Sequence, residues 1–77
     1  MDNVAVARAL EDLADLQELS GIAVFKVRAF RSAARAIEGL TENILDLVRN
    51  GKLKDVRGVG DGVARRIKEL AETGKIA

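Results

Sequence analysis

The fold of this chain is decided by residues 56–67, which read Val56-Arg57-Gly58-Val59-Gly60-Asp61-Gly62-Val63-Ala64-Arg65-Arg66-Ile67. Three glycines stand at alternate positions between two apolar patterns of helical period. Glycine adopts backbone conformations that other residues avoid, and it lets a ligand approach the main chain closely. The second helical pattern begins within the glycines, so its unpaired first N–H groups and its positive dipole end face the turn. Such a turn, followed by arginines, predicts a site for an anion such as phosphate.

The sequence around the glycine turn separates it from two other phosphate-binding motifs. No G-K-[ST] follows it, as in a Walker loop, and no strand-like apolar run precedes it, as in a dinucleotide-binding fingerprint. We therefore interpret it as the hairpin of a helix-hairpin-helix module that binds DNA. The alternative is an ordinary turn between helices that uses glycine only for its geometry.

Apolar residues recur with helical spacing through the chain, and no strand-like alternation persists. The pattern predicts four helices, over about residues 4–19, 24–38, 41–49 and 60–72. Thr41 is the expected N-cap of the third, and Gly74 closes the fourth. A weak echo at an offset of 37 residues aligns Gly21 with Gly58. The sequence predicts an all-α fold, a compact four-helix domain of two pseudo-repeated helix-hairpin-helix units, as a single domain over residues 1–77.

The apolar residues of the first two helices are expected to form the core. We expect Asp2 or Asn3 to cap the first helix. Phe30 lies on the apolar stripe of the second helix and is expected to be buried, whereas Phe25, at its start, could be buried or could stack on a base. The stripe of the first helix recurs at every third residue, and Val6 and Ala14 broaden its face. It consists of Val4, Ala7, Leu10, Leu13, Leu16 and Leu19.

The composition excludes several classes of function. The chain has no cysteine, histidine, tryptophan or tyrosine, which excludes disulfides, thiol chemistry and the usual zinc and haem ligands. No apolar run reaches the roughly 18 residues of a membrane span, and the N-terminus lacks the basic start of a signal peptide. The sequence therefore predicts a soluble cytoplasmic protein, associated with the nucleoid and not with a membrane.

The charged residues are unevenly distributed along the chain. The formal net charge is +1, but residues 1–20 sum to −4, residues 21–40 to +3 and residues 41–77 to +2. Arginine and lysine are suited to phosphate contacts, which are independent of base sequence and sensitive to salt. The alternative is a solvated face, or pairing between the acids of the first helix and the bases of the second. The basic candidates are Lys26, Arg28, Arg31 and Arg35 in the second helix, Arg65 and Lys68 in the fourth, and Lys75 beyond its end.

Over essentially its whole length the chain resembles a known protein family, the bacterial family X DNA polymerases. Residues 24–35 are similar to their "PFKVRAYRRAAR" signature, residues 56–60 with Ala64 to "LPGVGxxxA", and residues 72–75 to "ETGK". The similarity is to their N-terminal, polymerase beta-like domain, whose relatives bind gapped DNA and grip its 5′-phosphate. The resemblance implies a gapped or nicked DNA partner and a role in DNA repair. It is equally compatible with a free-standing protein and with an excised domain that accompanies the polymerase domains of a longer chain.

The resemblance also implies roles for individual residues. The hairpin would hold a DNA phosphate, and the carbonyls of Lys54, Val56 and Val59 would share a Na⁺ or K⁺ ion with it, with no other cofactor and no small-molecule substrate. Lys26 matches a lysine that contacts the 5′-phosphate, and Arg31 matches a basic position. The predicted DNA-binding residues are Lys26, Arg28, Arg31, Gly58, Val59, Gly60, Gly62, Arg65, Lys68 and Lys75.

Arg66 stands where beta-type relatives carry the lysine that forms a Schiff base with an abasic sugar. A Schiff base requires a neutral amine, whereas a guanidinium stays charged, so the sequence predicts a binding domain without lyase activity. Gly62 replaces a phosphate-contacting lysine of those relatives, and Phe30 replaces a common tyrosine. Two alternatives remain: a 5′-deoxyribose phosphate lyase that uses Lys26 or Lys68, and a helical module that kept the fold but binds another protein.

Overall fold

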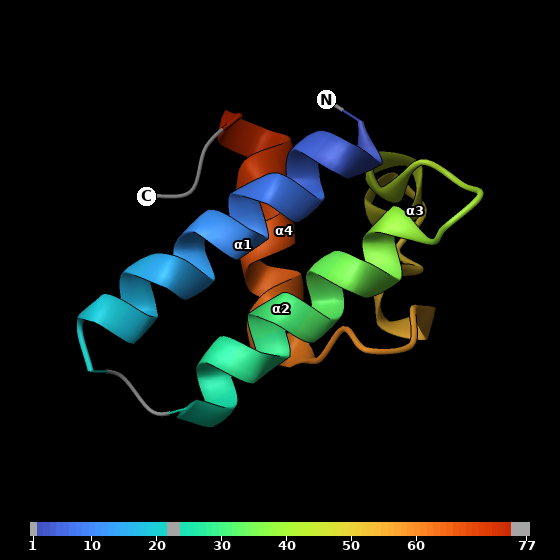
Figure 1. Cartoon of the computed structure of the whole chain (residues 1–77). Helices are drawn as coiled ribbons and strands as arrows, with labels where there is room; N and C mark the ends of the chain where they lie inside the picture. The colour runs from blue at the N-terminus through green and yellow to red at the C-terminus, as the bar shows by residue number, and fades with distance from the viewer. Residues whose placement is uncertain (1, 22–23, 75–77) are drawn as a thin grey trace.

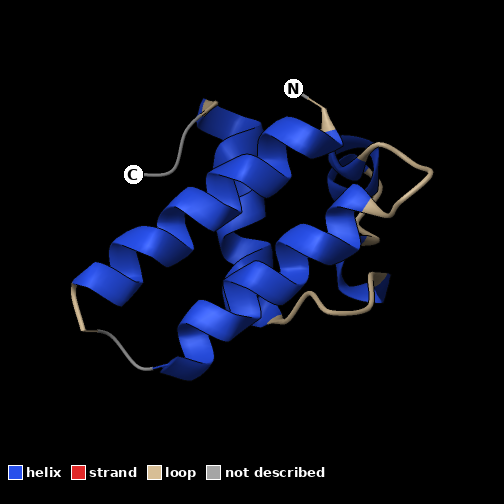
Figure 2. Ribbon diagram, viewed as in Figure 1, coloured by secondary structure: helices blue, strands red, loops and turns tan. Residues whose placement is uncertain are grey.

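The helices of the structure begin and end close to the predicted positions. The computed structural model describes residues 2–21 and 24–74. Helix α1 spans Asn3–Leu19, α2 spans Val24–Glu38, α3 spans Ile44–Arg49 and α4 spans Asp61–Thr73, with a 3₁₀ turn, η1, at Leu53–Asp55. No strand occurs in the described ranges, which confirms the all-α, four-helix prediction (Figures 1 and 2). None of the described helices combines the length and apolar character that a bilayer span needs.

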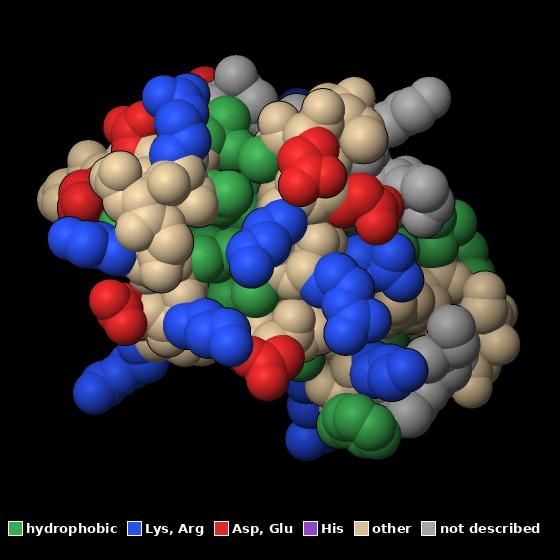
Figure 3. Space-filling model, turned by 180° about the vertical axis from the view of Figure 1, so that it is seen from behind, with side chains coloured by type: hydrophobic (Ala, Val, Ile, Leu, Met, Phe, Trp, Pro, Cys, Tyr) green, Lys and Arg blue, Asp and Glu red, His purple; other side chains and the backbone are tan. Residues whose placement is uncertain are grey.

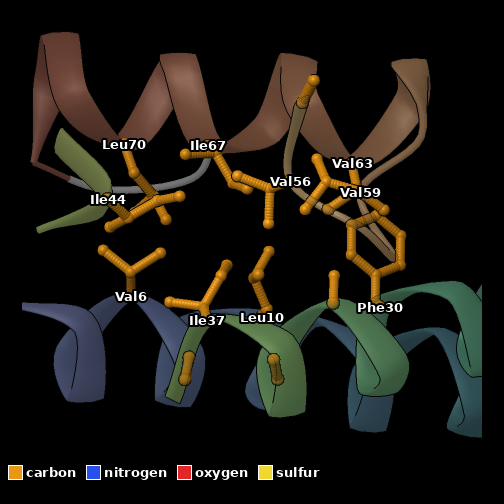
Figure 4. Packing of buried hydrophobic residues seen from close by; sticks show 14 of the residues in the cluster. Val6, Leu10, Phe30, Ile37, Ile44, Val56, Val59, Val63, Ile67 and Leu70 are labelled. Atoms are coloured by element: carbon orange, nitrogen blue, oxygen red, sulfur yellow. The ribbon is translucent and has the colours of Figure 1, made fainter. Parts of the chain in front are cut away.

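The helices form two layers that face each other across the core. Helices α1 and α2 lie antiparallel in one layer, α4 crosses behind them, and α3 with η1 lies beside α4 (Figure 1). Side chains from α1 and α2, such as Leu10 and Ile37, point toward side chains of the other layer, such as Ile67 (Figure 4). The buried core consists of Val6, Ala7, Leu10, Ala14, Val27, Phe30, Ala33, Ala34, Ile37, Ile44, Leu47, Leu53, Val56, Val59, Val63, Ala64, Ile67 and Leu70.

The two helical hairpins correspond to each other at the offset seen in the sequence. Helices α2 and α4 begin at Val24 and Asp61, which are 37 residues apart. Gly21 and Gly58 both have a left-handed backbone, with φ of 73° and 91°. The units differ in their first helix, because α1 is continuous over 17 residues whereas its counterpart is divided into α3 and η1. Two further pairs at this offset are buried: Leu10 with Leu47, and Phe30 with Ile67.

The predicted core stripe of α1 is wrong at three positions. Val4, Leu16 and Leu19 are exposed, Leu19 by 86%. Each residue of an α-helix turns by about 100°, so a stripe that repeats every third residue drifts by about 60° at each step and leaves the buried face. The residues of α1 that are buried follow the three- and four-residue spacing of a true helix face: Val6, Ala7, Leu10 and Ala14.

Two neighbouring side chains at the N-terminus have different tasks. The side chain of Asp2 caps α1 by accepting the Ala5 N–H at 2.8 Å. Asn3 instead joins α1 to the start of α3. Its Oδ1 accepts the Ile44 N–H at 2.7 Å, and its Nδ2 donates to the Glu42 carbonyl at 2.7 Å. Asn3 thus satisfies an amide in the first turn of a helix that is distant in the sequence.

Helix α3 starts later than predicted. Its N-cap is Asn43, whose side chain accepts the Leu45 N–H at 2.9 Å, so the prediction of Thr41 is wrong. The two hydrogen bonds from Asn3 hold residues 42–44 beside α1. This contact holds the chain outside the helix until Ile44, whose N–H is bound by Asn3 and at which α3 begins.

Candidate nucleic-acid interface

The turn between η1 and α4 is fixed by its backbone and by its packing. The Val59 N–H donates to the Val56 carbonyl at 3.2 Å and closes a four-residue turn. Gly58, the third residue of that turn, has a φ of 91°, which is the feature that a type II turn requires. A Cβ atom on Gly58 would lie 3.5 Å from the Cβ of Ala36 and 3.8 Å from the Ser32 carbonyl oxygen, so the turn rests directly on α2.

The N-terminus of α4 presents open backbone amides. Gly60 is the N-cap, and no side chain of the described residues provides a capping hydrogen bond there. The first N–H groups of a helix have no partner within the helix, and the dipole adds positive potential at this end. A Cβ atom added to Gly60 or Gly62 would meet no atom within 4 Å. The glycines therefore leave space next to these amides that an anion can enter.

A groove of about 420 Å³ lies beside these amides. It is bounded by the second half of α1, the start of α2 and the start of α4. Lys26, Arg65 and Arg66 line it together with Gly60 and Gly62. Lys and Arg side chains gather on this face of the molecule, seen from behind in Figure 3, with acidic side chains between some of them. The remaining lining residues are Gln17, Phe25, Ala29, Phe30 and Val63.

The cations around the groove differ in how they are paired. Arg66 lies 3.5 Å from the carboxylate of Glu69, one turn farther along α4. No ion pair within the described residues engages Lys26 or Arg65. These two side chains therefore keep their charge available to an anion in the groove.

Arg31 is held by α1. Its guanidinium lies 2.8 Å from Glu11, 2.9 Å from Asp15 and 3.7 Å from Glu18, and its side chain is 28% exposed. Hydrogen bonds to Asp15 and Glu11 raise the pKa of Arg31 above its ordinary value. For this residue the structure favours pairing between helices, and a DNA contact of Arg31 stays a prediction.

The other predicted DNA-binding residues fall into three groups. One group meets at the groove, and a second lies outside its lining. The third group is the turn, where the side chain of Val59 is buried, so that only its backbone would be open to a ligand. The groove brings together Lys26, Arg65, Gly60 and Gly62, whereas the exposed side chains of Arg28 and Lys68 do not line it. Gly58 forms the turn. Lys75 lies outside the described residues.

Six residues that line the groove were missing from the set predicted to bind DNA: Gln17, Phe25, Ala29, Phe30, Val63 and Arg66. Arg66 follows Arg65 directly, and the groove is wide enough to be lined by both. Phe25 is 71% exposed, which excludes its burial in the core, and a stacking contact of Phe25 stays a prediction. Phe30 is buried as predicted. Gln17 had no signal in the sequence, because it comes from α1 and reaches the site only through the tertiary fold.

Comparison with known proteins agrees with this geometry. Residues 1–76 match the helix-hairpin-helix domain family. The chain is also 36% identical over 70 residues to the DNA polymerase/3′-5′ exonuclease PolX of Bacillus subtilis (strain 168). That alignment covers 91% of this chain and 12% of the relative, so the chain spans only a small part of the polymerase that it matches. Its four helices, its glycine turn and these matches show that the chain belongs to the helix-hairpin-helix domain family of DNA-binding modules.

Proposed function

We propose that this domain binds gapped or nicked duplex DNA in DNA repair and contacts its backbone phosphates. The observation that carries the proposal is that one groove is lined both by the uncapped start of α4 and by Lys26 and Arg65, which form no ion pair within the described residues. A phosphate within the strand would lie on the amides at the start of α4, near Gly60 and Gly62. The 5′-phosphate of the downstream strand would lie between Lys26 and Arg65.

Binding of this kind reads no base sequence. Contacts to phosphate position a protein on DNA but carry no sequence information. Each neutralised phosphate releases counterions, so affinity falls as the salt concentration rises. We therefore expect the domain to recognise the structure of the DNA, a gap or a nick with its 5′-phosphate, independently of its sequence.

The hairpin carbonyls offer a place for a Na⁺ or K⁺ ion beside the phosphate. The Val56 carbonyl already accepts the Val59 N–H at 3.2 Å, and a carbonyl oxygen has a second lone pair that remains open to a cation. The carbonyls of Lys54 and Val59 would complete the set. Such an ion, when bound, supplies positive charge next to the phosphate.

We propose that the domain holds DNA and does no chemistry on it. Arg66 lines the groove where the resemblance to beta-type relatives implies their Schiff-base lysine, and its guanidinium cannot supply a neutral amine. Lys26 is the lysine of the described residues that lines the groove, so it is the remaining candidate for an adduct. Borohydride trapping on DNA with a 5′ abasic sugar should give no covalent adduct. An adduct that disappears in Lys26→Ala would establish the lyase alternative.

The similarity to PolX suggests in which kind of protein this DNA binding is used. The named activities of that relative, polymerase and 3′-5′ exonuclease, both act on DNA ends, and this chain aligns with 12% of its length. We propose that the domain presents a gap or nick to the polymerase domains of a longer chain. The phosphate sites described here would then set the position of the downstream strand.

Fluorescence anisotropy with a labelled duplex that contains a one-nucleotide gap tests the proposal. We expect tighter binding when the downstream strand carries a 5′-phosphate, and weaker binding as salt rises. Lys26→Ala should remove most of the preference for the phosphate. Lys52→Ala, an exposed lysine outside the groove lining, is the matched control and should leave it unchanged. Binding that ignores the 5′-phosphate would reduce the function to general DNA binding, and no binding at low salt would refute it.

A further inference from the structure

One buried polar atom, in a residue that lines the groove, has no hydrogen-bond partner. The Oε1 atom of Gln17 is the only buried side-chain nitrogen or oxygen of the described residues without a hydrogen bond. The core contains no buried polar or charged residue within the same ranges. Leaving a buried acceptor unsatisfied destabilises a folded protein, and native structures rarely contain such atoms without a functional reason.

Gln17 shares the lining of the groove with cations from two other helices. It lines the groove from α1, while Lys26 lines it from α2 and Arg66 lines it from α4. An apolar side chain of similar size would satisfy the packing at this position without the unpaired oxygen. Stability alone therefore does not account for a glutamine here.

We propose that Gln17 is a binding residue of the groove, and that its side-chain oxygen accepts a hydrogen bond from the terminal nucleotide of a DNA strand. The proposal rests on the proposed function and adds to it a contact that is not made to phosphate. Gln17 is only partly buried, and the last torsion of a glutamine side chain has broad minima. Rotation about this torsion would bring the carboxamide oxygen toward a ligand that enters the groove.

The chemistry of the oxygen restricts what it contacts. An amide oxygen accepts and cannot donate, and DNA phosphates also only accept, so a phosphate cannot be its partner. Two donors are available at a DNA end in the gap. The 3′-hydroxyl of the upstream strand is one, and the other is an N–H group of a terminal base whose pair with the template opens on binding. Every base carries an N–H on its Watson–Crick edge, so a contact to the base would still select no particular sequence.

The test compares Gln17→Met with the wild-type domain in thermal unfolding and in gapped-DNA binding. We expect Gln17→Met to unfold at the same or a higher temperature, because it removes the unpaired acceptor. We expect its affinity for gapped, 5′-phosphorylated DNA to fall about five-fold, the equivalent of one hydrogen bond. Gln17→Leu should likewise keep or raise the unfolding temperature and lower the affinity for gapped DNA. Leu16→Met, on the exposed neighbouring position of α1, should change neither property.

Two altered DNA ends identify the donor. A tetrahydrofuran residue at the 5′ end lacks the base, and a 3′-dideoxy terminus lacks the hydroxyl. The five-fold penalty of Gln17→Met should vanish on one of them. A penalty that persists on both, an unchanged affinity, or a loss of stability that matches the loss of binding would overturn the role of Gln17. Absence of wild-type binding to any gapped duplex would overturn the proposed function as well, so the two failures are distinguishable.

Discussion

Replacing Gly58 by alanine tests whether the turn has the left-handed geometry described above. With a φ of 91°, an alanine at this position adopts a conformation that L-residues avoid at a cost of about 1–2 kcal/mol. The new Cβ atom would lie 3.5 Å from the Cβ of Ala36 and 3.8 Å from the Ser32 carbonyl oxygen, which are ordinary contact distances. The backbone term therefore dominates. In a domain of this size each 1 kcal/mol lowers the melting temperature by about 4–8 °C, so we expect a decrease of about 4–16 °C.

Gly62→Ala is the matched control. Gly62 lies inside the first turn of α4, it has no positive φ, and an added Cβ atom meets nothing within 4 Å. A glycine-to-alanine change at such a helical position stabilises a protein by about 0.4–1 kcal/mol. The two variants should therefore shift the melting temperature in opposite directions, as measured by circular dichroism. Gly58→Ala with the melting temperature of the wild type would refute the assigned turn, whatever its effect on DNA binding.

Three further predictions concern the hydrogen bonds of Asn3, the ion pairs of Arg31 and the groove. Asn3→Ala should destabilise the domain by about 1–2 kcal/mol in urea unfolding, because it leaves the Ile44 N–H unsatisfied. Asn3→Asp keeps the acceptor and should lose less stability. Equal losses would contradict the role of the hydrogen bond from Ile44 to Asn3. Arg31→Ala should lower the melting temperature, and by less at high salt, because its ion pairs with α1 are partly exposed. It should leave the salt dependence of DNA binding unchanged. A flatter salt dependence would place Arg31 on the DNA. Arg65→Ala should reduce the slope of log affinity against log salt by about 0.9, the value for one lost phosphate contact, and an unchanged slope would exclude that contact.

The sequence predicted α2 well because its apolar residues follow the true helical spacing. Val27, Phe30, Ala33 and Ile37 recur three and four residues apart, and all four are buried. The ends of α1 and α4 were also predictable, because Gly21 and Gly74 have the left-handed backbone that ends helices. In these segments the local preference and the tertiary packing agree.

The sequence failed where a distant contact decides the local structure. Thr41 is a good N-cap by type, but Asn3 is hydrogen-bonded to residues 42 and 44, and α3 starts at Ile44 with Asn43 as its N-cap. Gln17 could not be assigned to the site, because nothing near it in the sequence resembles a phosphate motif. Both cases depend on α1 lying beside a segment that is more than twenty residues away.

The sequence also left open which of the basic residues remain available to DNA. Arg28, Arg31 and Arg35 are spaced to lie together on a helix, and spacing alone treats them alike. The fold separates them, because α1 places three carboxylates within 4 Å of Arg31. The packing of α1 on α2 is what determines this, and it is not encoded within α2.

This division of charges explains how a domain with a net charge of +1 can hold a polyanion. At physiological salt, exposed charges farther apart than about 8 Å are largely screened from each other. A phosphate at the start of α4 therefore responds to the charges around the groove more than to the sum over the chain. The acids of α1 that contact Arg31 are engaged in an ion-pair network within the protein, whereas Lys26 and Arg65 have no such pair within the described residues. Reversing the charge of an acid in that network should therefore alter stability more than DNA affinity, whereas a single change at Arg65 should do the opposite.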